Sequence, residues 1–275
     1  MSKTILIFLL IFGIPLVVVC LYLLAALAAA LFLWRKRNIR QWQNILREEP
    51  DFTPYEDITP DTIRFIVAIE DYKFWKHRGI NLSNIYYSAK HNIKRYLRII
   101  SRGDHSGDVR GGSTISQQLV KNMYFNYRKS YFRKVMEMFI TLWMERSISK
   151  QEIMELYMNF VFFGNGQYGI RQAARYYFDC APEEMTVSQS LFLLPLLFAP
   201  TMLNPYRVPE RFFNYRQIKV NELANYSVLQ EPELTRQRTE YTSDYPADNW
   251  IPRAPAKGTE TIPVCHPRSL TAPAL

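Results

Sequence analysis

The hydrophobic pattern opens with a long uncharged stretch near the N-terminus. Residues 4–34 carry no charged side chain, and they outnumber the roughly 20 residues that cross the core of a bilayer. We therefore predict a transmembrane anchor within residues 1–40. A cleavable signal is the competing interpretation, because Ala26-Leu27-Ala28 resembles a cleavage site, but the apolar region of a signal is normally only about 7–15 residues long.

Beyond the anchor, apolar residues recur mainly at helical spacing, and strand-like alternation is scarce. The pattern predicts a mainly α-helical domain over residues 41–225 that begins with a polar connector. The expected helices cover residues 61–77, 84–100, a segment that opens near Ser113, 131–147, 150–162, 170–179, 186–198 and 209–224. From residue 226 the chain becomes polar and proline-rich, so residues 226–275 are expected to form a largely disordered tail.

Two of the connecting regions have distinctive compositions. Segment 84–100 is basic and aromatic on one side and apolar on the other, which suits a membrane interface and equally an ordinary helix on a core. The polar, glycine-bearing residues 101–110 that follow are expected to form a mobile loop. Glycines at 164, 166 and 169 predict a tight turn.

Charge and cysteine content narrow the functional class. The formal net charge is +9, and a basic cluster at residues 35–40 follows the anchor. Counted alone, this cluster would keep the domain cytoplasmic, although it also suits anionic lipid head groups. Three cysteines are too few for a disulfide framework, and the four histidines show no metal-ligand spacing that would indicate zinc. No nucleic-acid partner is expected.

Two adjacent acids, Glu70 and Asp71, lie in an aromatic segment that ends at a glycine. In a helix over residues 61–77, Glu70, Phe74 and His77 fall at positions i, i+4 and i+7, so they would share one face and line a cleft. The alternative is a surface helix whose acids pair with neighbouring lysines and whose phenylalanine belongs to the core.

A second polar cluster lies at the start of the segment that opens near Ser113. Ser113 is a plausible N-cap, and Thr114, Gln118 and Lys121 follow along one helical face. A hydroxyl, an amide and an ammonium group beside a helix N-terminus would suit an anionic or a sugar ligand. A solvated polar face is the alternative.

Four motifs resemble the peptidoglycan glycosyltransferases, the cell-wall transglycosylases of glycosyltransferase family 51, over about residues 55–215. They occur in the family's order: Glu-Asp-x-x-Phe-x-x-His-x-Gly at 70–79, Gly-Gly-Ser-Thr-Ile-Ser-Gln-Gln-Leu-Val-Lys-Asn at 111–122, Arg-Lys-x-x-Glu at 133–137, and Glu-Leu-Tyr-Met-Asn to Tyr-Gly-Ile at 155–170. The resemblance implies a lysozyme-like, two-lobed helical fold whose smaller, membrane-facing lobe contains residues 84–100. It weakens at 194–200, where relatives commonly carry an Ala-Gly-Leu-Pro-like segment.

The resemblance also implies a reaction. The 4-hydroxyl of an incoming lipid II unit attacks the anomeric carbon of the growing chain, which expels undecaprenyl pyrophosphate with inversion. The implied partners are lipid II, the lipid-linked glycan strand, the bacterial membrane and other cell-wall synthesis proteins. The domain would face outward from a single-pass anchor, in conflict with the charge count. Because only about 60 mostly polar residues follow the helical domain, too few for a transpeptidase core, we expect a monofunctional enzyme.

The resemblance assigns roles to individual residues. Glu70 would act as the catalytic base, which an alcohol nucleophile requires near neutral pH. Glu137 would order the site through Arg133 or through a divalent cation such as Mg or Mn, although no cofactor is expected to be obligatory. The expected substrate-binding residues are Asp71, Phe74, His77, Thr114, Gln118, Lys121, Asn122, Arg133 and Lys134.

Two other functions remain open on this evidence. A lytic enzyme of lysozyme-like fold would cleave glycan strands with a carboxylic acid of raised pKa in an apolar pocket. A non-enzymatic membrane scaffold would keep the fold without the chemistry. The basic residues at 121, 133 and 134 favour a pyrophosphate ligand, which a glycan-cleaving enzyme does not meet.

Overall fold

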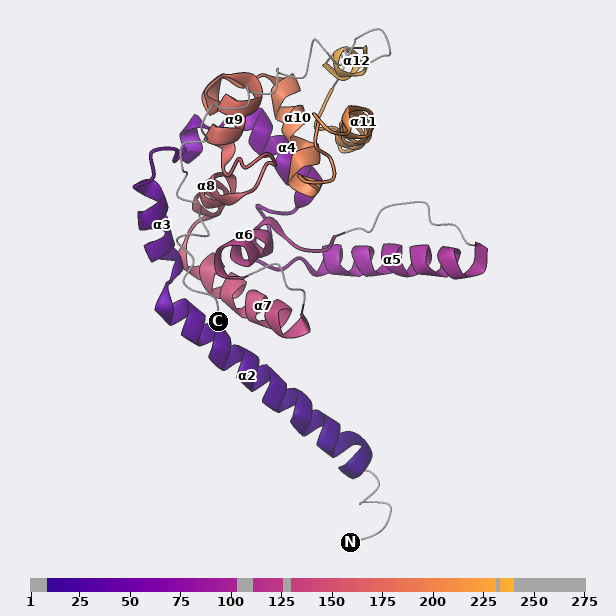
Figure 1. Cartoon of the computed structure of the whole chain (residues 1–275). Helices are drawn as coiled ribbons and strands as arrows, with labels where there is room; N and C mark the ends of the chain where they lie inside the picture. The colour runs from indigo at the N-terminus through magenta and orange to yellow at the C-terminus, as the bar shows by residue number, and fades with distance from the viewer. Residues whose placement is uncertain (1–8, 103–110, 126–129, 231–232, 240–275) are drawn as a thin grey trace.

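The computed structural model describes residues 9–102, 111–125, 130–230 and 233–239 (Figure 1). The regular structure in these ranges is helical apart from one isolated antiparallel bridge between Phe162 and Tyr168, which confirms the mainly α prediction. The elements are η1 (Leu9–Gly13), α2 (Ile14–Lys36), α3 (Ile39–Arg47), η2 (Tyr55–Asp57), α4 (Pro60–Glu70), α5 (Leu82–Arg102), α6 (Ile115–Tyr124), α7 (Tyr131–Ser147), α8 (Lys150–Phe160), α9 (Ile170–Phe178), η3 (Pro182–Glu184), α10 (Val187–Phe198), α11 (Pro209–Asn225) and α12 (Glu233–Thr239).

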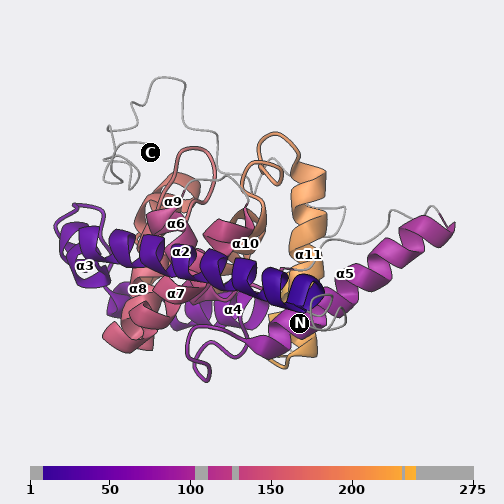
Figure 2. The same ribbon diagram turned by 90° about the horizontal axis from the view of Figure 1, so that it is seen from below.

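Helix α2 is the predicted anchor. The helix is long and apolar enough to cross a membrane, and most of its apolar side chains are exposed. Only Ala26 and Ala30 are fully buried, where α2 packs along α7 (Figures 1 and 2). At the end of this contact the rings of Trp34 and Trp143 lie 6.0 Å apart. The anchor is therefore packed against the domain at its C-terminal half.

The basic residues after the anchor contact the domain itself. Arg40 of α3 donates to the Glu152 carboxylate at 2.7 Å, and Arg47 donates to Glu155 at 3.0 Å. These ion pairs connect α3 to α8. Arg40 belongs to the basic cluster at residues 35–40, so one charge of that cluster has a role within the domain. The positive-inside count is therefore a weaker guide to the orientation of the anchor.

The core of the domain is built around α8. Every residue from Ile153 to Phe160 is buried, and the apolar helix α10 is buried from Ser190 to Leu196. Helix α4 adds one apolar face, including the fully buried Phe65 and Ile66. Each fully buried side chain of this size contributes about 1.5–3 kcal/mol of transfer free energy. This core supports the C-terminal end of α4 and the N-terminal end of α6.

Helix α5 projects from the side of the domain (Figure 1). It runs from Leu82 to Arg102, two residues beyond the predicted segment at each end, and many of its large apolar side chains, such as Ile93, Tyr96 and Leu97, are exposed. An exposed apolar stripe of this kind fits the membrane-interface alternative better than packing on a core. Residues 101 and 102 of the expected loop belong to α5, and the rest lies outside the described residues.

The predictions for the end of α4 and for the N-cap of α6 are wrong. The helix predicted over 61–77 ends at Glu70, because Asp71 leaves the helical conformation and its carbonyl accepts from the Phe74 amide at 2.7 Å in a turn. The N-cap of α6 is Thr114 rather than Ser113. The Thr114 hydroxyl accepts from the Gln117 amide, and the Gln117 side chain accepts from the Thr114 amide in return.

The domain also extends beyond the predicted boundary at residue 225. Leu229 and Leu234 are buried, and α12 lies beside α11 where a disordered tail was expected. The fully buried Gln237 accepts from the Arg216 guanidinium and donates to Ser188 at 2.6 Å. A buried polar network of this kind holds the segment on the domain. The rest of the expected tail, 240–275, lies outside the described residues.

Candidate active site

Glu70 is the last residue of α4 and lines a cleft of about 310 Å³. The cleft lies between α5 and α6 on one side and α11 on the other. Asn84 and His91 line it from α5, and Lys219 and Glu222 line it from α11. Of the predicted site residues, Glu70 and Gln118 line this cleft.

A hydrogen-bond relay positions the Glu70 carboxylate. The side-chain amide of Gln118 donates to Glu70 Oε2 at 2.9 Å, and the Tyr157 hydroxyl donates to the Gln118 oxygen at 3.3 Å. Burial, and then the Glu70 charge, raises the pKa of Tyr157 well above its usual value, so this hydroxyl keeps its proton. The relay fixes which end of the Gln118 amide faces the carboxylate, and Glu70 Oε1 accepts no hydrogen bond from the residues that the structure describes.

The turn after Glu70 is braced against the start of α6. Asp71 Oδ2 accepts from His77 Nε2 at 2.7 Å and from the Ile115 amide at 3.2 Å. His77 Nδ1 accepts from the Gly79 amide at 3.0 Å, so the ring proton lies on Nε2 and is donated to Asp71. The Thr114 hydroxyl donates to the Gly79 carbonyl at 2.6 Å. These bonds hold the end of α4 next to α6.

This brace buries four of the predicted substrate-binding residues. Phe74 and Thr114 have no exposed surface, Asp71 is 1% exposed, and the His77 side chain is 8% exposed. None of the four side chains lines the cleft, and their part in substrate binding stays a prediction. The predicted shared face of Glu70, Phe74 and His77 does not form, because α4 ends at Glu70.

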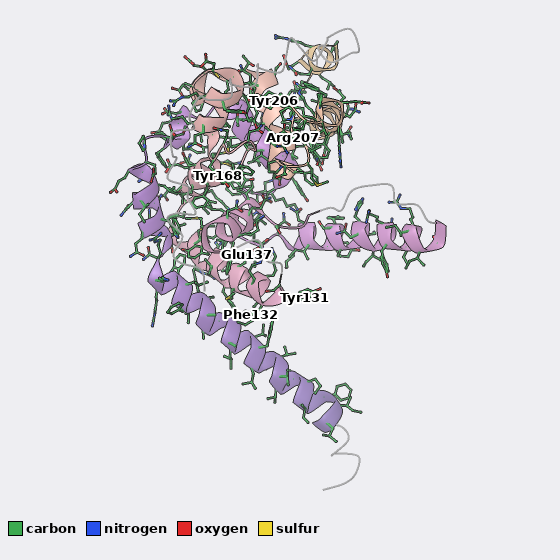
Figure 3. All side chains as sticks on the ribbon, viewed as in Figure 1. Tyr131, Phe132, Glu137, Tyr168, Tyr206 and Arg207 are labelled. Atoms are coloured by element: carbon green, nitrogen blue, oxygen red, sulfur yellow. The ribbon has the colours of Figure 1, made fainter. Side chains whose placement is uncertain are left out.

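A cluster of three cations around Glu137 forms the second part of the site. Arg133 Nη1 lies 3.3 Å from Glu137 Oε2, and Lys134 Nζ donates to Glu137 Oε1 and to the Ser113 hydroxyl at 3.0 Å. The Glu137 carboxylate is 1% exposed, whereas the Lys134 side chain is 38% exposed. Figure 3 shows Glu137 on α7, the helix that begins at Tyr131.

Lys121 connects this cluster to Glu70. Burial is the largest effect on the Lys121 ammonium, and it lowers the pKa. The Glu137 charge raises this pKa, the Arg133 and Lys134 charges lower it, and the Glu70 charge raises it. A lysine held near two other cations with one buried acid between them is suited to an anion that adds negative charge. Asn122 is partly buried on the same helix, and its role stays a prediction.

The donor set at Glu137 does not fit a divalent cation. Both carboxylate oxygens already accept from cationic side chains. Across the part of the chain that the structure describes, no three His, Cys, Asp or Glu side chains are grouped as metal ligands. Mg²⁺ prefers several oxygen ligands, so a bridging metal at Glu137 would have to displace Arg133 or Lys134.

Comparison with known proteins identifies the family. A family profile described as Transglycosylase matches residues 36–224, which is most of the chain. The chain belongs to the transglycosylase family. The protein called "Biosynthetic peptidoglycan transglycosylase" of Acinetobacter baylyi is 40% identical over 159 residues, 58% of this chain and 66% of the relative. Its namesake in Nitrosomonas eutropha is 34% identical over 174 residues, 63% of this chain and 67% of the relative.

Longer relatives carry this transglycosylase domain as one part of their sequence. "Penicillin-binding protein 1A" of Rickettsia typhi is 38% identical over 168 residues, which are 61% of this chain and 20% of that protein. The chain thus spans about a fifth of the length of these relatives. The match confirms the family that the four motifs resemble and the helical domain with an apolar N-terminal helix.

Sequence reasoning missed several residues of the transglycosylase site. Tyr157 lies inside a motif that was recognised, but its hydroxyl contact with Gln118 is visible only in three dimensions. Tyr215, Ile218 and Lys219 of α11 face the cleft, although their helix showed only an ordinary amphipathic pattern. No local signal in α11 could have assigned them to the site.

Proposed function

We propose that the chain polymerises lipid II into β-1,4-linked glycan strands of peptidoglycan and releases undecaprenyl pyrophosphate. One observation supports this most strongly. The Glu70 carboxylate opens into a cleft, and its charge acts on Lys121, which is itself coupled to the cations around Glu137. A base and an anion site next to each other are the two groups that this reaction needs. The names of the transglycosylase relatives agree with it.

In the proposed mechanism Glu70 removes the proton from the 4-hydroxyl of the incoming sugar as the new C–O bond forms. Gln118 holds Glu70 Oε2 at 2.9 Å, so Oε1 is the oxygen that takes the proton in this mechanism. Base catalysis of this kind contributes about 10²–10⁴-fold. Attack on the face opposite the leaving group inverts the anomeric carbon, which converts the α-linked donor into a β-linked product.

The leaving pyrophosphate gathers negative charge as the old C–O bond breaks. Lys121, Arg133 and Lys134 stabilise this charge in the proposed mechanism. Glu137 keeps Arg133 and Lys134 oriented before the ligand binds, so less reorganisation is needed when the charge develops. The neighbouring Phe132 contacts Tyr22 of α2 at 5.4 Å, which puts the cationic cluster next to the anchor, where a lipid-linked pyrophosphate would lie.

A lipid substrate also determines the orientation that we propose. The domain faces outward from a single-pass anchor in the bacterial cell membrane, because flipped lipid II is presented there. Helix α5 lies in the membrane interface with its exposed apolar stripe. The expectations that the chain is monofunctional and works with other cell-wall synthesis proteins stay predictions.

The experiment that tests this function compares two substrates. The full-length protein in detergent is incubated with lipid II and, separately, with purified glycan strands, each with and without a chelator. We expect consumption of lipid II, release of undecaprenyl pyrophosphate and insensitivity to the chelator. Consumption of the purified glycan alone would establish the lytic alternative, and consumption of neither would favour the scaffold.

A further inference from the structure

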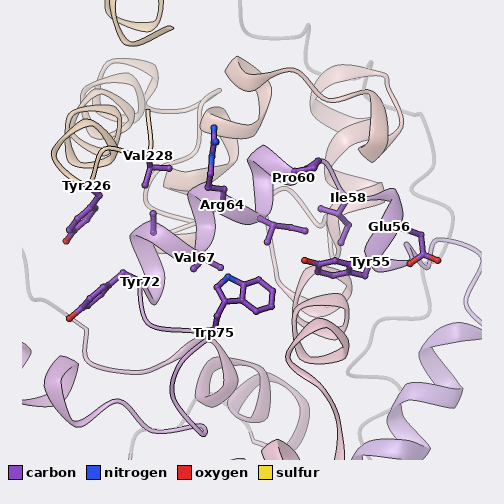
Figure 4. A pocket seen from close by; sticks show the side chains of 12 residues that line it. Tyr55, Glu56, Ile58, Pro60, Arg64, Val67, Tyr72, Trp75, Tyr226 and Val228 are labelled. Carbon is purple, nitrogen blue, oxygen red and sulfur yellow. The ribbon is translucent and has the colours of Figure 1, made fainter. Parts of the chain in front are cut away.

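A second cavity of about 620 Å³ lies along α4, next to the catalytic cleft (Figure 4). We call it the aromatic groove. It is lined from η2, α4, the turn at residues 72–75 and the segment after α11. None of its lining residues belongs to α2 or α5, whose exposed apolar side chains form the proposed membrane contacts. The aromatic groove is therefore separate from the proposed membrane contacts.

The groove has a composition suited to sugar rings. Trp75 is 46% exposed, and Tyr72 and Tyr226 are each 42% exposed, although all three are large aromatic residues. Figure 4 shows Tyr72 and Tyr226 at one end of the cavity, Tyr55 at the other, and the indole of Trp75 between them. Aromatic rings with polar edges can stack on the C–H face of a pyranose and hydrogen-bond its hydroxyl groups.

The aromatic groove adjoins the cleft at Glu70. Ala68, Tyr72 and Tyr226 line both cavities. The rings of Tyr72 and Tyr226 are stacked, with centroids 6.4 Å apart and an angle of 5° between their planes. Tyr72 follows Glu70 by only two residues. A chain that leaves the reaction centre past this pair of rings would enter the aromatic groove.

We propose that the aromatic groove binds sugar rings of the growing glycan strand, several units away from the bond that is formed. This proposal rests on the proposed function, which makes the product a polymer longer than the 310 Å³ cleft can hold. The occupant is a β-1,4-linked chain of N-acetylated pyranoses. The groove has Arg64 and Glu56 at its edge but lacks the cationic cluster that a pyrophosphate would need.

Binding is tested without catalysis, in the full-length Glu70→Gln protein in detergent micelles. The probe is the hexamer of β-1,4-linked N-acetylglucosamine, measured by titration calorimetry. We expect Trp75→Ala to weaken the Kd about tenfold, on the scale of a lost aromatic contact, and Trp75→Phe to weaken it less. Tyr176→Ala removes a partly exposed ring of α9 that lines neither cavity, and it should leave the Kd unchanged.

A second measurement follows the product of the otherwise wild-type enzyme. Trp75 lines only the aromatic groove, so Trp75→Ala should keep the initial rate of lipid II consumption within about twofold and shorten the glycan strands. If Trp75→Ala fails to fold, Val228→Trp fills the same groove and should give the same two effects.

Three results would overturn the proposal. They are an unchanged Kd in the folded Trp75→Ala or Val228→Trp protein, unchanged strand lengths in both, or competition by a prenyl phosphate for the groove in place of the oligosaccharide. These outcomes differ from failure of the proposed function. A wild-type protein that does not polymerise lipid II refutes the function, whereas the binding experiment does not depend on turnover.

Discussion

Replacing Glu137 by Gln removes the carboxylate that holds the cationic cluster together. The substitution keeps the shape of the side chain and takes away one negative charge from a position that is 1% exposed. Arg133 and Lys134 then lose their shared carboxylate partner, and Lys121 loses the group that most favours its protonated form. We expect two separable effects, one on stability and one on the pH dependence of the reaction.

The structure gives the size of the stability effect. Charges 3.3 Å apart, as in the Arg133–Glu137 pair, attract by about 5 kcal/mol at an effective dielectric constant of about 20. Desolvation offsets part of this, and breaking a buried pair from one side typically costs about 3–5 kcal/mol. Because the Arg133 side chain is 17% exposed and regains some hydration, we expect the free energy of unfolding to fall by about 3 kcal/mol.

The pH effect has a definite sign. Lys121 binds an anion only while protonated, so activity falls as the pH rises through its pKa. That pKa is already lowered by burial, and Glu137 is the main group that opposes the lowering. Glu137→Gln therefore lowers the pKa further, and the alkaline limb of kcat/KM for lipid II should move to lower pH.

Glu145→Gln is the matched control for this prediction. Glu145 is also on α7, its side chain is 4% exposed, and it accepts from Lys150 at 2.7 Å. The Glu145→Gln protein should lose a comparable free energy of unfolding in urea. Its kcat/KM should keep the wild-type dependence on alkaline pH, because Glu145 is not among the groups that shift the pKa of Lys121. The prediction is wrong if the alkaline limb of kcat/KM does not shift in Glu137→Gln, or if it shifts equally in both variants.

Three further predictions concern other contacts. Gln118→Leu removes the donor to the Glu70 carboxylate, and kcat should fall about 10–100-fold with the fold intact by circular dichroism. Gly169→Ala should lower the free energy of unfolding by about 1–3 kcal/mol, because φ is +80° and the new Cβ would lie 2.8 Å from a backbone oxygen of α8. Gly166→Ala is the control: φ is also +80° but the Cβ would meet no atom within 4 Å, so the loss of stability should be smaller. Gln237→Ala removes the hydrogen bonds of Gln237 to Arg216 and Ser188 from the buried network and should lower the free energy of unfolding by about 1–3 kcal/mol, together with faster proteolysis after residue 225.

Locally encoded elements could be predicted from the sequence. Helix α7 begins and ends at the predicted residues, because Ser130 caps it and its apolar spacing is regular. Helix α8 begins at Lys150 as predicted, after the Ser149–Glu152 capping box. The glycines at 164, 166 and 169 all have positive φ, as the predicted tight turn requires. In each case the signal lies within a few residues of the element.

Contacts between distant segments determine what could not be predicted. The periodicity of 61–77 continued past Glu70, but the bond from the Ile115 amide to Asp71 joins residues 44 apart in the sequence and ends the helix. The Gln118–Glu70 bond spans 48 residues. Helix α12 has a polar sequence, and its Gln237 accepts from the buried guanidinium of Arg216, which lies 21 residues earlier in the sequence. Local patterns do not reveal partners at such separations.

The central claim is that Glu70 removes the proton from the attacking hydroxyl. Its most direct test is the rate of undecaprenyl pyrophosphate release from lipid II by full-length wild type and Glu70→Gln, with Glu222→Gln as a control acid that lines the same cleft. The account predicts a fall of at least about a hundredfold for Glu70→Gln, with lipid II still bound and with little change for the control. A Glu70→Gln protein that retains more than about a tenth of the wild-type rate would contradict it.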